Sequence, residues 1–175
     1  MSDLNRLASL VKSRNTVENN IATLIGQPVN LQSVGEYIAS VIFSIELNKP
    51  RTNKGSDGRF IQGPLAEHTV DVQWRTKHDG LMNIKQDFFP DYYLLFTGPK
   101  ESASLHSILN PWVIESVFLF NSSELLAALH ERGVQLGSGT SITGPLWERA
   151  EIYPIQRDNR LILSNEQQQF LALFR

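Results

Sequence analysis

Two aspartates stand fourteen residues apart in a stretch of the sequence whose pattern predicts that they meet. Asp57 lies in the turn-like segment Gly55–Arg59, and Asp71 lies in the alternating segment Thr69–Arg75. Two carboxylates joined by a hairpin-like connection can converge on one metal ion. Such a site, with cations beside it, suits phosphodiester hydrolysis, because the metal activates water and offsets charge on the transition-state oxygens.

The segment around Asp71 predicts a strand with one polar face. Val70, Val72 and Trp74 alternate with polar residues, so these three share one face of the strand. The opposite face then carries Thr69, Asp71, Gln73, Arg75 and Lys77. This pattern places a carboxylate, an amide and two cations on the same side of the sheet.

Glu36 is a candidate third acid. It lies in a segment, about 32–44, whose apolar spacing predicts a helix, and buried carboxylates are uncommon unless they are paired or bind a metal. The alternative is a capping box formed by Ser33 and Glu36, in which the glutamate reaches back to the start of its own helix. The residues by themselves leave both interpretations open.

The order of these acids resembles the PD-(D/E)XK nuclease-like superfamily, particularly restriction endonucleases of the Mrr-like kind. The resemblance runs from about Gly35 to Lys77 and continues through the strands and helix that follow. The helix glutamate of the family corresponds to Glu36, and its motif aspartate corresponds to Asp57. Its acidic-x-lysine strand corresponds to Asp71-Val72-Gln73, so a glutamine stands in the lysine position.

The resemblance implies a metal-dependent endonuclease that hydrolyses DNA, of a restriction or defence type. Asp57 and Asp71 would hold Mg²⁺ or Mn²⁺ with support from Glu36, and Gln73 and Lys77 would lie near the scissile phosphate. An amide can orient water but cannot carry positive charge or change its protonation state. The alternative is therefore a non-catalytic module on the same fold that binds nucleic acid or protein.

Contacts with DNA would need a local basic patch, because the formal net charge of the chain is −2. The candidate cations lie before, between and after the two aspartates: Lys49, Arg51, Lys54, Arg59 and Arg75. Lys77 and Lys85 follow them. A solvated loop without a ligand explains the same charges equally well.

A second reading of the family motif starts at Pro90-Asp91 and continues at Glu115-Ser116-Val117. It ranks lower, because Val117 cannot take the electrostatic role of a lysine. Asp91 also stands at the start of an apolar strand, where an acid most often ends a turn.

The elements that must position these residues follow from periodicity and capping patterns. Helices are predicted over about 4–25 and 32–44, from the Asn121 cap to Gly133, and after Ser164; strands are predicted near 58–61, 69–75, 91–96 and 112–120. The first helix is expected to pack on the core. This order predicts an α/β (α+β) domain of three layers with a mixed central sheet flanked by helices, which the resemblance specifies as restriction-endonuclease-like.

The length of 175 residues predicts a single domain. It would comprise an N-terminal helical segment (1–27), a nuclease-like core (30–135), and a loop with a C-terminal helix (136–175). No apolar run approaches the length of a membrane helix, and the start lacks the layout of a secretory signal, so we expect a cytoplasmic protein without membrane contact. A homodimer is expected only because cleavage of two strands commonly uses two active sites.

Overall fold

A six-stranded mixed sheet forms the centre of the fold, with strands in the order β1-β2-β3-β5-β6-β8. The computed structural model describes residues 2–48, 55–100 and 111–175. β3 and β5 are parallel, whereas the other neighbouring strands are antiparallel. The strands of this sheet are β1 (Ile45–Leu47), β2 (Gly58–Phe60), β3 (Thr69–Arg75), β5 (Tyr92–Thr97), β6 (Ser116–Asn121) and β8 (Glu151–Tyr153).

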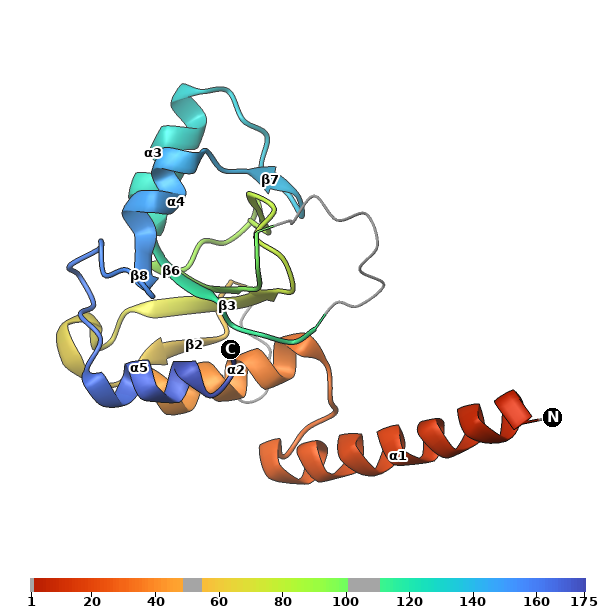
Figure 1. Cartoon of the computed structure of the whole chain (residues 1–175). Helices are drawn as coiled ribbons and strands as arrows, with labels where there is room; N and C mark the ends of the chain where they lie inside the picture. The colour runs from red at the N-terminus through yellow and green to blue at the C-terminus, as the bar shows by residue number, and fades with distance from the viewer. Residues whose placement is uncertain (1, 49–54, 101–110) are drawn as a thin grey trace.

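Helices cover both faces of the sheet, which confirms the predicted three-layer α/β arrangement (Figure 1). α2 and α5 pack on one face, and α3 and α4 pack on the other. A small second sheet, made of β4 (Leu81–Met82) and β7 (Thr140–Ser141), lies beside the second face. The helices are α1 (Ser2–Ile25), α2 (Leu31–Ile42), α3 (Ser122–Glu131), α4 (Gly144–Ala150) and α5 (Asn165–Ala172), with a short 3₁₀ turn at Gly63–Leu65.

Each face of the sheet has its own hydrophobic core, because side chains alternate along the central strands. Val70, Val72 and Trp74 of β3 belong to the core beneath α2 and α5, as their alternation predicts. Tyr93 and Leu95 of β5 belong to the opposite core. On β3, the residues paired with these two are polar, namely Asp71 and Gln73, and both are buried.

Side-chain caps fix the starts of three helices. The Asn30 side chain accepts a hydrogen bond from the Ser33 N–H at 2.8 Å, so α2 begins one turn before Glu36. The alternative of a Ser33–Glu36 capping box is therefore wrong: Ser33 is the reciprocal partner of Asn30, and Glu36 lies inside the helix. The predicted caps of α3 and α5, Asn121 and Ser164, are confirmed.

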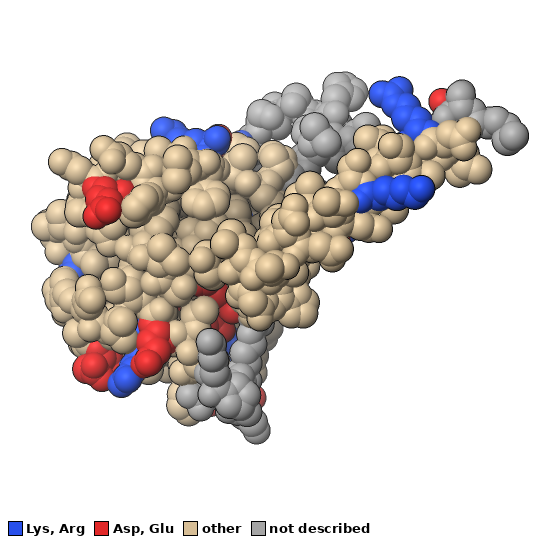
Figure 2. All heavy atoms as spheres, turned by 90° about the horizontal axis from the view of Figure 1, so that it is seen from below, with Lys and Arg blue, Asp and Glu red and all other residues tan. Residues whose placement is uncertain are grey.

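The two ends of the chain depart from the predicted arrangement. β8 and α4 fall in a stretch for which a loop was predicted, and β8 completes the edge of the main sheet. α1 is one continuous helix, but the expectation that it packs on the core is wrong. Its N-terminal half extends beyond the rest of the molecule and carries exposed apolar side chains (Figures 1 and 2). Among the described helices, none is long and apolar enough to cross a membrane.

Candidate active-site cleft

β2 and β3 diverge at the position of the candidate site. Their pairing stops at Gly58 and Val70, although β3 continues for several residues. Beyond that point, side chains bind the backbone of Val72. The Asp57 carboxylate accepts a hydrogen bond from the Val72 N–H at 2.8 Å, and the Gln32 amide donates one to the Val72 carbonyl at 2.5 Å. Side chains from two other segments thus form the hydrogen bonds to Val72 that the backbone of a neighbouring strand would otherwise form.

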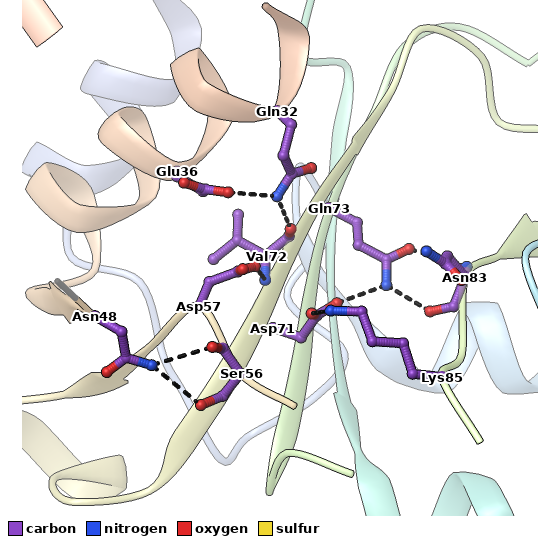
Figure 3. Close-up of polar contacts among 10 residues, drawn as sticks. All are labelled: Gln32, Glu36, Asn48, Ser56, Asp57, Asp71, Val72, Gln73, Asn83 and Lys85. Atoms are coloured by element: carbon purple, nitrogen blue, oxygen red, sulfur yellow. Dashed lines mark hydrogen bonds and ion pairs between the residues drawn. The ribbon is translucent and has the colours of Figure 1, made fainter. Parts of the chain in front are cut away.

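A cleft of about 1280 Å³ lies where the strands diverge, between α2, β1 and β3. Glu36, Asp57, Asp71 and Gln73 line it together with Lys85, so the fold gathers the predicted acids from three separate elements. Figure 3 shows Glu36, Asp57 and Asp71 following one another along the cleft. In the view from below, acidic atoms are visible in a hollow beside the base of α1 (Figure 2).

Glu36 is held in the cleft by its own helix. Its side chain is almost completely buried, with 4% exposed, and it accepts a hydrogen bond from Gln32 at 2.9 Å. Because Gln32 also binds the Val72 carbonyl, it connects Glu36 to the open edge of β3. Gln32 was missed by the sequence interpretation, although its position one turn before Glu36 was the available signal.

Gln73 anchors a neighbouring segment to β3. Its Oε1 accepts a hydrogen bond from the Asn83 N–H at 3.0 Å, and its Nε2 donates to the Asn83 carbonyl at 2.6 Å and to Asp71 at 2.7 Å. Only one orientation of the amide satisfies all three contacts. The anchored segment brings Lys85, whose Nζ lies 3.8 Å from an Asp71 oxygen. The sequence identified Lys85 only as one cation of a basic region, because no periodic pattern connects it to Asp71.

The cleft carries more negative charge than its nearest cation offsets. The pKa of Asp71 is raised to about 6, mainly by burial, then by the charge of Asp57, and least by the charge of Glu36. The hydrogen bond from Gln73 and the charge of Lys85 lower this pKa, but they do not cancel the rise. Burial, and then the charge of Asp71, also raises the pKa of Tyr93 to about 12. The contributions of Asp57 and Asp71 to these two shifts show that negative charge accumulates here, which would favour a bound cation electrostatically.

The predicted cations outside the cleft have other partners or positions. Arg59 forms ion pairs with Glu46 and Glu67 at 2.8 and 2.9 Å. Arg75 pairs with Asp79 at 2.6 Å. Neither arginine lines the cleft.

Lys77 follows the end of β3, is exposed, and does not line the cleft either, so the cation that faces Asp71 is Lys85 rather than Lys77. The other predicted DNA contacts, Lys49, Arg51 and Lys54, lie outside the described residues.

Asp91, from the lower-ranked motif, has a structural role. Its carboxylate accepts hydrogen bonds from the backbone N–H and the hydroxyl of Thr69, at 2.8 and 2.9 Å. It thereby joins the start of β5 to the start of β3, as expected of an acid at a turn. Val117 of the same motif is completely buried in the core.

The donor set fits a small, hard cation bound by two carboxylates. Within the described residues, no group of three or more His, Cys, Asp or Glu side chains is placed to hold a metal ion. Mg²⁺, however, usually takes one or two protein carboxylates and keeps several waters. Asp57 and Asp71 supply that pair, and the repulsion between them is what a bound cation would relieve.

The cleft therefore brings together the carboxylates of Asp57 and Asp71, a lysine next to Asp71 and a third carboxylate from α2. No family model matches the chain, and no curated protein sequence matches it.

Proposed function

We propose that this protein is a metal-dependent endonuclease that hydrolyses phosphodiester bonds in DNA, on a restriction-endonuclease-like fold. The observation that carries the proposal is the convergence of Glu36, Asp57 and Asp71 on one cleft, with an Asp71 carboxyl whose pKa is raised to about 6. Buried acids that repel one another destabilise a fold unless a cation offsets their charge, and cation binding is the function that this chemistry supports.

In this proposal Asp57 and Asp71 hold Mg²⁺ or Mn²⁺. When bound, the ion activates the attacking water and offsets charge on the phosphate oxygens. Asp71 must lose its proton to act as a ligand, so binding strengthens as the pH rises through about 6. Glu36, oriented by Gln32, supports the site from the side of α2.

Lys85 takes the electrostatic role for which Gln73 is unsuited. Its ammonium group lies 3.8 Å from Asp71 and lines the same cleft, where it can bind a phosphate oxygen beside the metal. Gln73 acts indirectly, because its amide holds Asn83, and with it the segment that carries Lys85, against β3. Gln73 is thus a positioning residue in this proposal.

A plasmid-cleavage assay with Mg²⁺ or Mn²⁺ tests the enzymatic claim. Asp57→Asn and Asp71→Asn keep hydrogen-bond acceptors at these positions but remove the charges, and each should lower the cleavage rate by about a hundredfold or more. Lys85→Ala should cause a comparable loss, whereas Lys77→Ala, the matched lysine outside the cleft, should cleave normally. Absence of cleavage by the native chain, or equal rates for the native chain and the Asp57 and Asp71 variants, would refute the proposal.

A non-catalytic binding module remains the second candidate. The observation in its favour is Gln73 itself, whose amide is fully engaged with Asn83 and Asp71 and supplies no charge. Calorimetry with Mn²⁺ separates the two functions: heat of binding that disappears in Asp57→Asn favours the nuclease, whereas no binding to the native chain favours the module.

A further inference from the structure

α1 carries a regular heptad pattern along almost its whole length. Residues spaced alternately three and four apart form one stripe, and this 3.5-residue period is typical of helices that pair as coiled coils. The stripe consists of Leu4, Leu7, Val11, Arg14, Glu18, Ile21 and Ile25. The leucines and the valine of this stripe are exposed, for example 56% for Leu7 and 47% for Val11, so the other described residues leave that part of the stripe uncovered.

Two opposite charges interrupt the stripe at its middle. Arg14 and Glu18 form an ion pair within the helix, at 2.8 Å between Nη2 and Oε1. A charged pair in an otherwise apolar seam weakens association with any partner that cannot match it, and so determines orientation and register. The pattern therefore specifies which surface can cover α1.

A second α1 running in the opposite direction matches this pattern. When Arg14 faces Glu18 of the second copy, Val11 faces Ile21 and Leu7 faces Ile25, and the twofold symmetry repeats each contact. A parallel pair would set Arg14 against Arg14 and Glu18 against Glu18. An antiparallel pair shifted by one heptad would set both charges against apolar side chains. Only one arrangement satisfies both the charges and the apolar residues.

The residues beside the stripe agree with the same register. Exposed apolar side chains flank it on one edge, and in the antiparallel pair Leu10 lies near Leu24 of the second copy while Val17 lies near its own counterpart. On the other edge the two alanines are small, with Ala8 near Ala22, and Asn15 lies near its own counterpart. The pairing thus covers the exposed apolar side chains of α1 from Leu7 to Leu24.

We propose that α1 is a dimerisation helix that forms an antiparallel coiled coil with α1 of a second copy, in the register that pairs Arg14 with Glu18. The proposal rests on α1 alone and is independent of the function proposed for the cleft. It has a consequence for the cleft, because Ile25 and Gly26 line it. In this pair, the N-terminal residues of each α1 lie beside the cleft of the other copy. The C-terminal ends of the two α1 helices, which border the clefts, lie about 27 Å apart along the pair.

Charge reversal tests the register on the full-length chain. Arg14→Glu and Glu18→Arg each place like charges opposite one another in a homodimer, so each variant alone should dissociate about tenfold or more readily than the native dimer. An equimolar mixture of the two restores opposite charges and should form a heterodimer. Sedimentation equilibrium measures all four samples, and circular dichroism checks that each variant keeps its helix content.

Cysteine cross-linking tests the orientation, because the native chain contains no cysteine. Asn15→Cys places a thiol near the twofold axis of the antiparallel pair, so two copies should form a disulfide under mild oxidation. Leu7→Cys places its thiols at opposite ends and should not. Any of three results would overturn the proposal: a monomeric native chain, a mixture of the two charge variants that fails to associate, or efficient cross-linking through Leu7→Cys. If the chain dimerises as expected but does not cleave DNA, the dimerisation proposal stands and only the proposed nuclease function fails.

Discussion

Asp71→Asn should make the protein more stable at neutral pH. In the folded chain the pKa of Asp71 is raised from 3.8 to about 6, first by burial and then by the charge of Asp57. Below about pH 4 the carboxyl is protonated in both the folded and the unfolded states and has no effect. As the pH rises from about 4 to 6, the unfolded chain loses this proton while the folded chain keeps it, so the free energy of unfolding falls. The full shift corresponds to a loss of about 3 kcal/mol above pH 6.

The asparagine variant lacks this titration. The difference in the free energy of unfolding, variant minus native, should therefore grow by about 3 kcal/mol between about pH 4 and pH 7 in urea titrations without divalent metal. Asp79→Asn is a control for which the opposite sign is expected. Burial raises the pKa of Asp79, but its hydrogen bonds and the charge of Arg75 lower the pKa overall. The Asp79 carboxylate therefore stabilises the fold above its unfolded pKa, and its replacement should destabilise the protein at neutral pH. A difference for Asp71→Asn that does not change with pH would refute the electrostatic description of the cleft.

Further predictions concern the metal, the anchor and the turn at Asp57. Mn²⁺ at saturating concentration should raise the melting temperature of the native chain by about 5 °C, and scanning calorimetry of Asp57→Asn should show little or no rise. Gln73→Glu should cost about 3 kcal/mol at pH 7, because it removes the hydrogen bond donated to the Asn83 carbonyl and adds a third buried acid beside Glu36 and Asp71; urea titration should show a smaller loss near pH 5. Gly58→Ala should cost about 2 kcal/mol in the same assay, because a Cβ there would collide with the Glu46 carbonyl; unchanged stability would mean that β1 can shift away.

The fold could be predicted from the sequence wherever one local pattern decided the structure. The alternation of Val70, Val72 and Trp74 defined β3, and the Asn121 and Ser164 caps defined α3 and α5. Short elements without such a signal were missed, among them β1, β8 and α4, since their formation depends on tertiary pairing and packing.

For the candidate site, the sequence placed Glu36, Asp57 and Asp71 correctly on the elements that form one cleft. It could not indicate that Lys85 lies next to Asp71, because that contact depends on the hydrogen bonds between Gln73 and Asn83, which join segments ten residues apart in the chain. The start of α2 was predicted within one residue, but the cap at that start was left open for a related reason. Two overlapping capping patterns compete there, and only the Asn30 contacts decide between them.

The hydrogen bond from the Val72 N–H to Asp57 has an evolutionary consequence. An asparagine at position 57 would still offer an oxygen to that N–H, and an asparagine at position 71 would remove a buried charge, so neither change threatens the fold. Each requires only one base change in an aspartate codon. A chain drifting under selection for stability alone would readily lose both charges. The fold therefore does not require the two aspartates, and any requirement for them must come from the charges that they place in the cleft.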